Sequence, residues 1–218
     1  NGTIPNLSSE PYKTLLENNF IFEAKNLKGN ALLDWLVSHA ESKGKTLQKE
    51  DAQVLVDMVG ENRSMLETQL EKILLYLKDK NEITIESIQK ASSLLKQFTI
   101  FDLQDAIAER DKPRAIEIAY NLLDSGFEPV YIVSMLTRYF TGLSKVAELK
   151  SKNMPDQAAA RIVGTHPFYY RGYIKARTIF SDDKLIEVFR ALLKADISIK
   201  TTNLDDKTLI TILISEIL

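Results

Sequence analysis

The stretch that decides the fold class is PVYIVSMLTRYFTGLSKVAELKSK, residues 129–152. It begins with proline, which is tolerated at the start of a helix because the N–H that it lacks would have no helical partner there. Its apolar residues recur at the spacing of one helix face, at Ile132, Met135, Leu136, Tyr139, Leu143 and Val146. The stretch therefore predicts a long helix that packs this face against other helices.

Helices are also expected on both sides of this stretch. Before it, residues 101–107 begin one helix, and Pro113 opens another that ends at Gly126. After it, the expected helices cover 155–163, 167–180, 182–200 (with Ser181 as the N-cap) and 205–218. The last of these is apolar on nearly all sides, so we expect it to be central and buried.

Residues 30–92 carry similar helical start and stop signals. The expected helices run from an N-cap at Asn30 to Gly44, from about 48 to a stop at Gly60, onward from Asn62, and from a cap at Thr84. The helix after Asn62 keeps an apolar stripe for more than three turns. These signals predict a compact helical unit, with a domain boundary near residues 92–97.

The segment FIFEAK, residues 20–25, is the one part of the chain whose aromatic and β-branched residues indicate a strand. A single strand needs partners, and the chain offers no second convincing strand. We therefore expect its sheet to lie in an upstream domain, in agreement with a chain that starts at Asn1 without methionine or a targeting segment. The predicted fold class is all-α, with a short extended segment at the N-terminus.

The composition excludes several classes of function. Apolar residues make up 44% and charged residues 27% of the 218-residue chain, as in globular proteins, and the apolar residues are too dispersed to cross a membrane. The formal net charge of -2 argues against a protein that covers nucleic-acid phosphates. The absence of cysteine excludes disulfides and a cysteine-built zinc site, and it suits a reducing compartment, so we expect a cytoplasmic location.

One short motif resembles part of a nucleotide site. Gly44-Lys45-Thr46 is the ending of a phosphate-binding loop, which needs a further glycine five residues before Gly44. That position is His39, and the segment ends a predicted helix instead of starting one, so its N–H groups do not converge on an anion. We expect no nucleotide site there.

The two histidines and the acidic pairs also have structural explanations. His39 follows Trp35 by four residues, which places both rings on one helix face. His166 precedes Pro167 at the start of a predicted helix, where capping or packing is its simplest role. The acidic pairs fall in first turns of predicted helices, where carboxylates favour the helix dipole. We therefore expect no catalytic residue, no metal, no cofactor and no enzyme activity of the chain itself.

Residues 168–177, FYYRGYIKAR, are the most suggestive binding segment, because cations alternate with aromatic rings that can stack on bases. In a helix, however, the spacing of these residues places the aromatic and the basic side chains on different sides. One face then carries Tyr169, Tyr173, Ala176 and Phe180, and a solvated flank carries Arg171, Lys175 and Thr178. A helical nucleic-acid-binding module that uses Arg171, Lys175 and Arg177 is thus an alternative function.

Three segments together resemble the DNA polymerase III delta subunit family: FTIFDL at 98–103, GTHPF at 164–168 and LLKADISIKT at 192–201. Their order and separation match as well. The stretch GENRSMLE at 60–67 resembles the lid domain of clamp-loader modules of the AAA+ type. The residues that carry the resemblance, which we expect to be structural, are Phe101, Asp102, His166, Pro167 and Phe168.

The resemblance implies three parts: residues 1–29 as the remnant of an upstream nucleotide-binding-like domain, 30–93 as a lid domain, and 94–218 as a helical collar domain. It implies a non-catalytic subunit of the clamp loader, which places the sliding clamp on primed DNA for the replicative polymerase. The chain would then count as a nucleotidyltransferase component only through membership of the polymerase holoenzyme.

The resemblance also implies partners. The collar would contact other clamp-loader subunits, the missing N-terminal domain would make most of the contact with the sliding clamp, and primed DNA would be met in the assembled complex. Arg63 corresponds to the lid arginine that senses nucleotide phosphate in ATP-hydrolysing relatives. In this family, which resembles those relatives in shape but lacks a working nucleotide site, Arg63 is expected to be a surface or interface residue.

Overall fold

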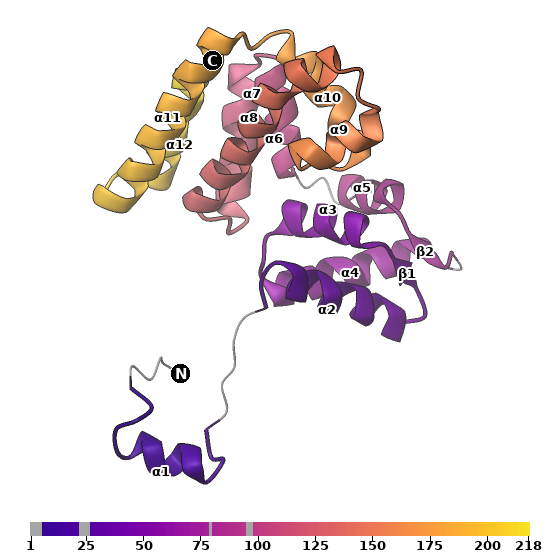
Figure 1. The fold of residues 1–218 in the computed structure, drawn as a ribbon, viewed down its shortest axis with the longest axis vertical. Helices are drawn as coiled ribbons and strands as arrows, with labels where there is room; N and C mark the ends of the chain where they lie inside the picture. The colour runs from indigo at the N-terminus through magenta and orange to yellow at the C-terminus, as the bar shows by residue number, and fades with distance from the viewer. Residues whose placement is uncertain (1–5, 22–26, 79, 95–97) are drawn as a thin grey trace.

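The computed structural model describes residues 6–21, 27–78, 80–94 and 98–218. Within these ranges the chain forms twelve helices and one two-stranded sheet (Figure 1). The expected all-α fold class is therefore confirmed.

A short helix near the N-terminus was not predicted. Helix α1 (Tyr12–Glu17) buries none of its residues and lies apart from the rest of the chain in Figure 1. Most of the strand expected at 20–25 lies outside the described residues, and Phe20 and Ile21, which are described, form no strand.

The N-terminal helical group consists of four helices and two very short strands. These are α2 (Asn30–Ser42), β1 (Thr46–Leu47), α3 (Lys49–Val59), α4 (Arg63–Leu77), β2 (Glu82–Ile83) and α5 (Ile85–Leu94). The strands pair in parallel, with Leu47 opposite Ile83, and both of these side chains are buried. Strands of two residues are too short to show an alternating pattern, so sequence reasoning missed this sheet.

The helix ends of this group mostly follow the sequence signals. The side chain of Asn62 accepts a hydrogen bond from the backbone N–H of Met65, as an N-cap does. Gly60 ends α3 with a φ of +87°, which a residue with a Cβ rarely adopts. The expected cap at Asn30 is wrong by one residue: Gly29 occupies the N-cap position, and Asn30 is the first helical residue.

The C-terminal helical group contains the remaining helices. They are α6 (Ile100–Ala108), α7 (Lys112–Asp124), α8 (Pro129–Ser151), α9 (Asp156–Val163), α10 (Pro167–Arg177), α11 (Asp182–Thr201) and α12 (Asp206–Ile217). Helix α8 lies at the centre and contacts α6, α9, α10 and α11. All six apolar residues of its predicted face are buried, which confirms the sequence analysis of this helix.

Helix α12 is placed differently from the sequence expectation. It buries one face, which carries Leu209, Ile210, Leu213, Ile214 and Ile217. It packs mainly on α7 and α11 at the edge of the group, and Ile212 remains 41% exposed (Figure 1). The expected burial is thus confirmed for one face, whereas the expected central position is wrong.

Candidate functional site

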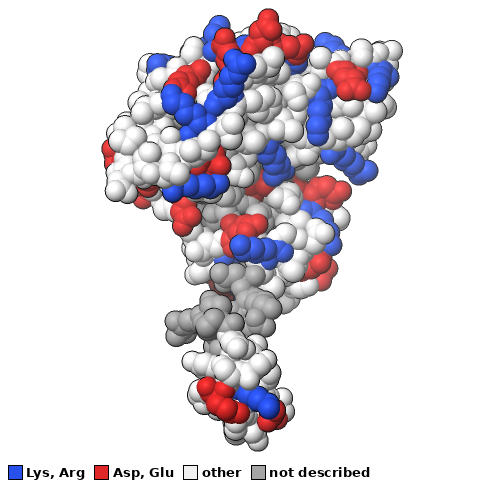
Figure 2. Space-filling model, turned by 60° about the vertical axis from the view of Figure 1, so that its left-hand side comes forward, with Lys and Arg blue, Asp and Glu red and all other residues white. Residues whose placement is uncertain are grey.

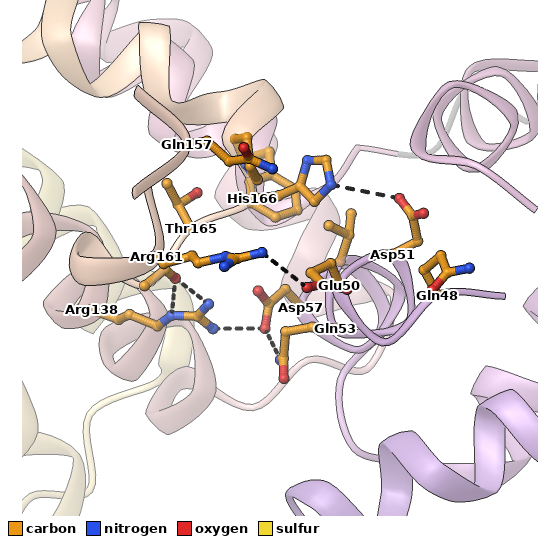
Figure 3. Close-up of a pocket in the computed structure, with 14 residues that line it drawn as sticks. Gln48, Glu50, Asp51, Gln53, Asp57, Arg138, Gln157, Arg161, Thr165 and His166 are labelled. Atoms are coloured by element: carbon orange, nitrogen blue, oxygen red, sulfur yellow. Dashed lines mark hydrogen bonds and ion pairs between the residues drawn. The ribbon is translucent and has the colours of Figure 1, made fainter. Parts of the chain in front are cut away.

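An open groove of about 590 Å³ lies between the two helical groups (Figure 3). One wall is the polar face of α3, and the other is formed by α8, α9 and the turn that leads into α10. Apolar side chains from both groups, Val54 and Phe101, contribute to the lining. The groove is therefore a site to which both halves of the chain contribute.

The tightest contact across the groove joins Asp57 to Arg138. The guanidinium of Arg138 donates from Nη1 to Oδ1 of Asp57 at 2.8 Å, and the same carboxylate oxygen accepts from the amide of Gln53 at 2.7 Å. Nε of Arg138 also donates to the carbonyl oxygen of Gly164, at 3.1 Å. Arg138 thereby links α3 to the end of α9.

The environment of Asp57 is largely closed to solvent. Its side chain is 9% exposed, and this burial raises the pKa of the carboxyl group above its usual value, while Arg138 and Gln53 act in the opposite direction. The hydroxyl of Tyr131 points to the backbone at the same end of α3. It lies within donating distance of two carbonyl oxygens, 3.0 Å from that of Asp57 and 3.2 Å from that of Val56. Burial raises the pKa of Tyr131 as well, so its hydroxyl remains a donor at neutral pH.

Two further contacts between an acidic and a basic side chain span the groove at the other end of α3, and the one made by His166 is an ion pair only when that histidine is protonated. Nη2 of Arg161 lies 3.8 Å from Oε1 of Glu50, and both side chains are more than half exposed. Nε2 of His166 lies 3.7 Å from Oδ1 of Asp51, a pair that is less exposed. Burial raises the pKa of Asp51, and His166 partly offsets this. Both distances are too long for direct hydrogen bonds, so the Arg161–Glu50 contact is an electrostatic one.

Charge is sorted by side across the groove. The three acids, Glu50, Asp51 and Asp57, all belong to α3, and the three basic partners belong to the C-terminal helical group (Figure 3). Helix α3 is therefore electrostatically matched to the wall that it faces.

The residues that carry the family resemblance lie beside this groove. Asp102 forms a reciprocal capping box with Thr99 at the start of α6, and the ring of Phe101 stacks on Tyr169 with centroids 4.1 Å apart. Nδ1 of His166 accepts from the backbone N–H of Phe168, so His166 caps α10 and turns Nε2 toward Asp51.

The other two residues that carry the family resemblance lie at the start of α10. Pro167 opens α10, and Phe168 is 49% exposed.

Sequence reasoning missed Asp57 and Arg138. Each is a charged residue inside an otherwise apolar run, in VLVDMV at 54–59 and SMLTRYF at 134–140. A charge in such a run needs a partner when the helix is packed, and this is the signal that indicates a buried pair.

The basic residues of α10 are not gathered into one surface. Arg171 and Lys175 are exposed, whereas Arg177 is largely buried and donates to the carbonyl oxygen of Phe180 and the carboxylate of Asp182. Lys175 lies near Asp105, where it opposes the rise in that carboxyl's pKa that burial causes. Basic and acidic side chains are also interspersed over the face shown in Figure 2.

The remaining candidates lie in the N-terminal helical group. Arg63 is exposed, and its guanidinium carbon is 4.6 Å from the centre of the Trp35 ring, which in turn stacks on His39. Nζ of Lys45 donates to the carbonyl oxygens of Lys78 and Lys80, at 2.9 and 2.8 Å. Arg63 is thus a surface residue of this chain, and Lys45 of the Gly44-Lys45-Thr46 motif joins two loops.

The described part of the chain contains no cluster of three or more His, Cys, Asp or Glu residues that could hold a metal ion. None of its helices is both long and apolar enough to span a membrane.

These features define a helical scaffold in which a largely buried carboxylate, that of Asp57, joins one helical group to the other through Arg138. Residues 97–217 match the family model described as the C-terminal domain of the DNA polymerase III delta subunit. The chain therefore belongs to the DNA polymerase III delta subunit family.

Individual relatives agree with this assignment. The DNA polymerase III subunit delta of Bacillus subtilis (strain 168) is 24% identical over 206 residues, which cover 94% of this chain and 59% of the relative. A protein from Aquifex aeolicus (strain VF5) named "Probable DNA polymerase III subunit delta" is 23% identical over 177 residues, which cover 79% of this chain and 51% of the relative. This chain thus spans between half and three fifths of the length of these relatives.

A solved structure is similar as well. The Bacillus subtilis DNA clamp loader delta protein superposes with a TM-score of 0.53 and 25% sequence identity. The match covers 96% of this chain and 62% of that protein. The similarity therefore extends over both helical groups.

Proposed function

We propose that this chain is a non-catalytic part of a clamp loader, which assembles with other loader subunits to place the sliding clamp on primed DNA for replication. The observation that carries the proposal is the family match over residues 97–217, which is the whole C-terminal helical group. The similarity to a clamp loader delta protein over 96% of this chain supports it. Such a role also agrees with the cytoplasmic location expected from the sequence.

The proposal assigns a role to each part of the chain. Residues 30–93 would be a lid domain and residues 94–218 a collar domain that contacts neighbouring subunits, while residues 1–29 would belong to an upstream domain that makes most of the clamp contact. The change from one helical group to the other between α5 and α6 supports the division near residue 94.

An exposed apolar stripe on α11 supports the oligomerisation role. Ile186, Leu193 and Ile197 follow each other at intervals of seven and four residues, which places them on one helix face, and they are 51%, 62% and 51% exposed. Beside them, α8, α9 and α11 enclose a second groove of about 710 Å³. A helix of a neighbouring loader subunit is the partner that this surface suits under the proposal.

The alternative function as a nucleic-acid-binding module has weaker support. Of its three residues, Arg177 is held by Phe180 and Asp182, and Lys175 has the carboxylate of Asp105 nearby. Salt-dependent binding of primed DNA by the isolated chain would favour this alternative.

The test is assembly with the other subunits of the loader, followed by size-exclusion chromatography. We expect the chain to elute with the complex, and Leu193→Glu/Ile197→Glu to elute alone because two charges would enter the apolar contact. Ile212→Glu is the matched control, since Ile212 is a similarly exposed apolar residue on α12. If the unaltered chain never enters the complex, the proposed function is wrong.

A further inference from the structure

The contacts across the groove differ in strength along α3. At its C-terminal end, Asp57 is buried, binds Arg138 at 2.8 Å and Gln53 at 2.7 Å, and has the hydroxyl of Tyr131 at its backbone carbonyl. At its N-terminal end, Glu50 and Asp51 meet their partners only at 3.8 and 3.7 Å, and all four residues line the groove. One end of α3 is thus fixed and the other is loosely held.

We propose that the two helical groups form a pivoting joint, in which Asp57, Arg138 and Tyr131 fix one end of α3 while Glu50 and Asp51 at the other end close onto Arg161 and His166. The opposite charges of Glu50 and Arg161, joined by those of Asp51 and His166 when the histidine is protonated, favour the closed position. The inference rests on this geometry alone and does not depend on the proposed function.

The dimensions of α3 make small rotations effective. A rise of about 1.5 Å per residue separates Glu50 from Asp57 by about 10 Å along the helix. A rotation of about 10° around Asp57 then moves the other end by roughly 2 Å, enough to turn contacts of 3.7 and 3.8 Å into hydrogen bonds or to separate them. The groove of about 590 Å³ provides the space for this movement.

The two ends respond differently to salt. Glu50 and Arg161 are 58% and 69% exposed, so high ionic strength screens their attraction. Asp57 is 9% exposed, and a buried pair is screened much less. A hydrogen bond of 3.1 Å from the amide of Gln89 to the hydroxyl of Tyr169 also bridges the groups, and it carries no charge. Salt therefore acts mainly on the Glu50–Arg161 pair and leaves the pivot in place.

The test is a distance measurement between the helical groups in the full 218-residue chain. The chain has no cysteine, so two introduced cysteines can carry spin labels without further changes. Glu71→Cys on α4 and Ala147→Cys on α8 are exposed and lie in different groups. Pulsed electron–electron double resonance then gives the distribution of distances between the two spin labels.

We expect one narrow distribution at low salt, and a second, shifted population in about 1 M salt, where the screening length falls to about 3 Å. Arg161→Glu should raise the open population about two- to fivefold at low salt, since exposed pairs change equilibria by such factors. The charge swap Glu50→Arg/Arg161→Glu should restore the original distribution. The joint is refuted if Arg161→Glu leaves the distribution unchanged, or if the swap behaves like the single variant.

A separate substitution tests the role of Arg138 in the pivot. Arg138→Lys keeps the charge but cannot hold Asp57 and the carbonyl oxygen of Gly164 at once, so the distribution should broaden at every salt concentration. The fluorescence of Trp35, the single tryptophan, shows that the N-terminal helical group remains folded in each variant. An Arg138→Lys distribution as narrow as that of the unaltered chain would overturn the pivot assignment.

Discussion

The guanidinium of Arg138 on α8 lies 2.8 Å from the carboxylate of Asp57 on α3, although 81 residues separate them in the sequence. The pair joins the two helical groups at the buried end of the groove. A buried ion pair contributes little net stability when it replaces apolar packing, but breaking it leaves one charge without its partner. Its main effect is therefore on how the two groups fit together.

Removal of Arg138 should destabilise the chain. We predict that Arg138→Met lowers the free energy of unfolding by about 2–3 kcal/mol, less than for a fully buried pair because the arginine side chain is 38% exposed. The measurement is urea unfolding followed by circular dichroism. Arg190→Met is the control, since Arg190 is exposed on α11 and its loss should change the free energy by less than about 0.5 kcal/mol.

The coupling between the two residues can be measured in a double-mutant cycle. In Asp57→Asn/Arg138→Met no charge remains in the pair, so the combined loss should be at least about 1 kcal/mol smaller than the sum of the single losses. Additive losses would show that the two side chains do not interact in solution.

The pKa of Asp57 predicts a pH dependence. A carboxyl group whose pKa is higher in the folded than in the unfolded chain binds its proton more tightly when folded. Its contribution to stability is therefore full below the unfolded pKa of about 3.9 and is lost as the pH rises through the folded pKa. Relative to Asp57→Asn, the unaltered chain should thus become less stable as the pH rises from acidic values towards neutral.

Urea midpoints of the unaltered chain and of Asp57→Asn, taken in parallel from about pH 3.5 to pH 7, check this sign. Contributions of other groups cancel in the difference between the two proteins. The raised pKa would be contradicted if the stability of the unaltered chain minus that of Asp57→Asn stayed constant or increased as the pH rises.

Sequence patterns predicted the helices well because periodicity and caps are local properties. The apolar face of α8, the helix start after Asn62 and the cap at Ser181 all appear as expected. Helix α1 was missed because it has six residues and buries none of them, so it has no periodic pattern.

What surrounds each helix could not be predicted in the same way. The composition of α12 shows that it is apolar, but not that α7 and α11 cover only one of its faces. Likewise, a charge in an apolar run shows that Asp57 needs a partner, whereas only the fold brings Arg138 to it. His166 and Phe101 were identified as family positions, and the groove that they border became visible only in three dimensions.

The capping box at the start of α6 should stabilise the C-terminal helical group. Oγ1 of Thr99 accepts from the backbone N–H of Asp102, and the carboxylate of Asp102 accepts from the backbone N–H of Thr99 at 2.6 Å. We predict that Thr99→Ala lowers the free energy of unfolding by about 1 kcal/mol, whereas Thr99→Ser, which keeps the hydroxyl, changes it by less than half of that. Urea unfolding measures both, and equal losses would mean that the methyl group, and not the cap, is responsible.

Substitution of two helical glycines by alanine should change the free energy of unfolding in opposite directions. A Cβ on Gly142 of α8 would lie 2.7 Å from a ring carbon of Tyr173 and 3.0 Å from the backbone oxygen of Val163, whereas a Cβ on Gly172 of α10 would meet no atom within 4 Å. Gly142→Ala should therefore force α9 and α10 away from α8 and lower the free energy of unfolding by about 1–3 kcal/mol. Gly172→Ala should raise it by about 0.5–1 kcal/mol, because alanine loses less backbone entropy in a helix. Thermal unfolding of the two variants compares the same substitution at a closed and an open position, and a stable Gly142→Ala would show that the three helices do not pack this closely.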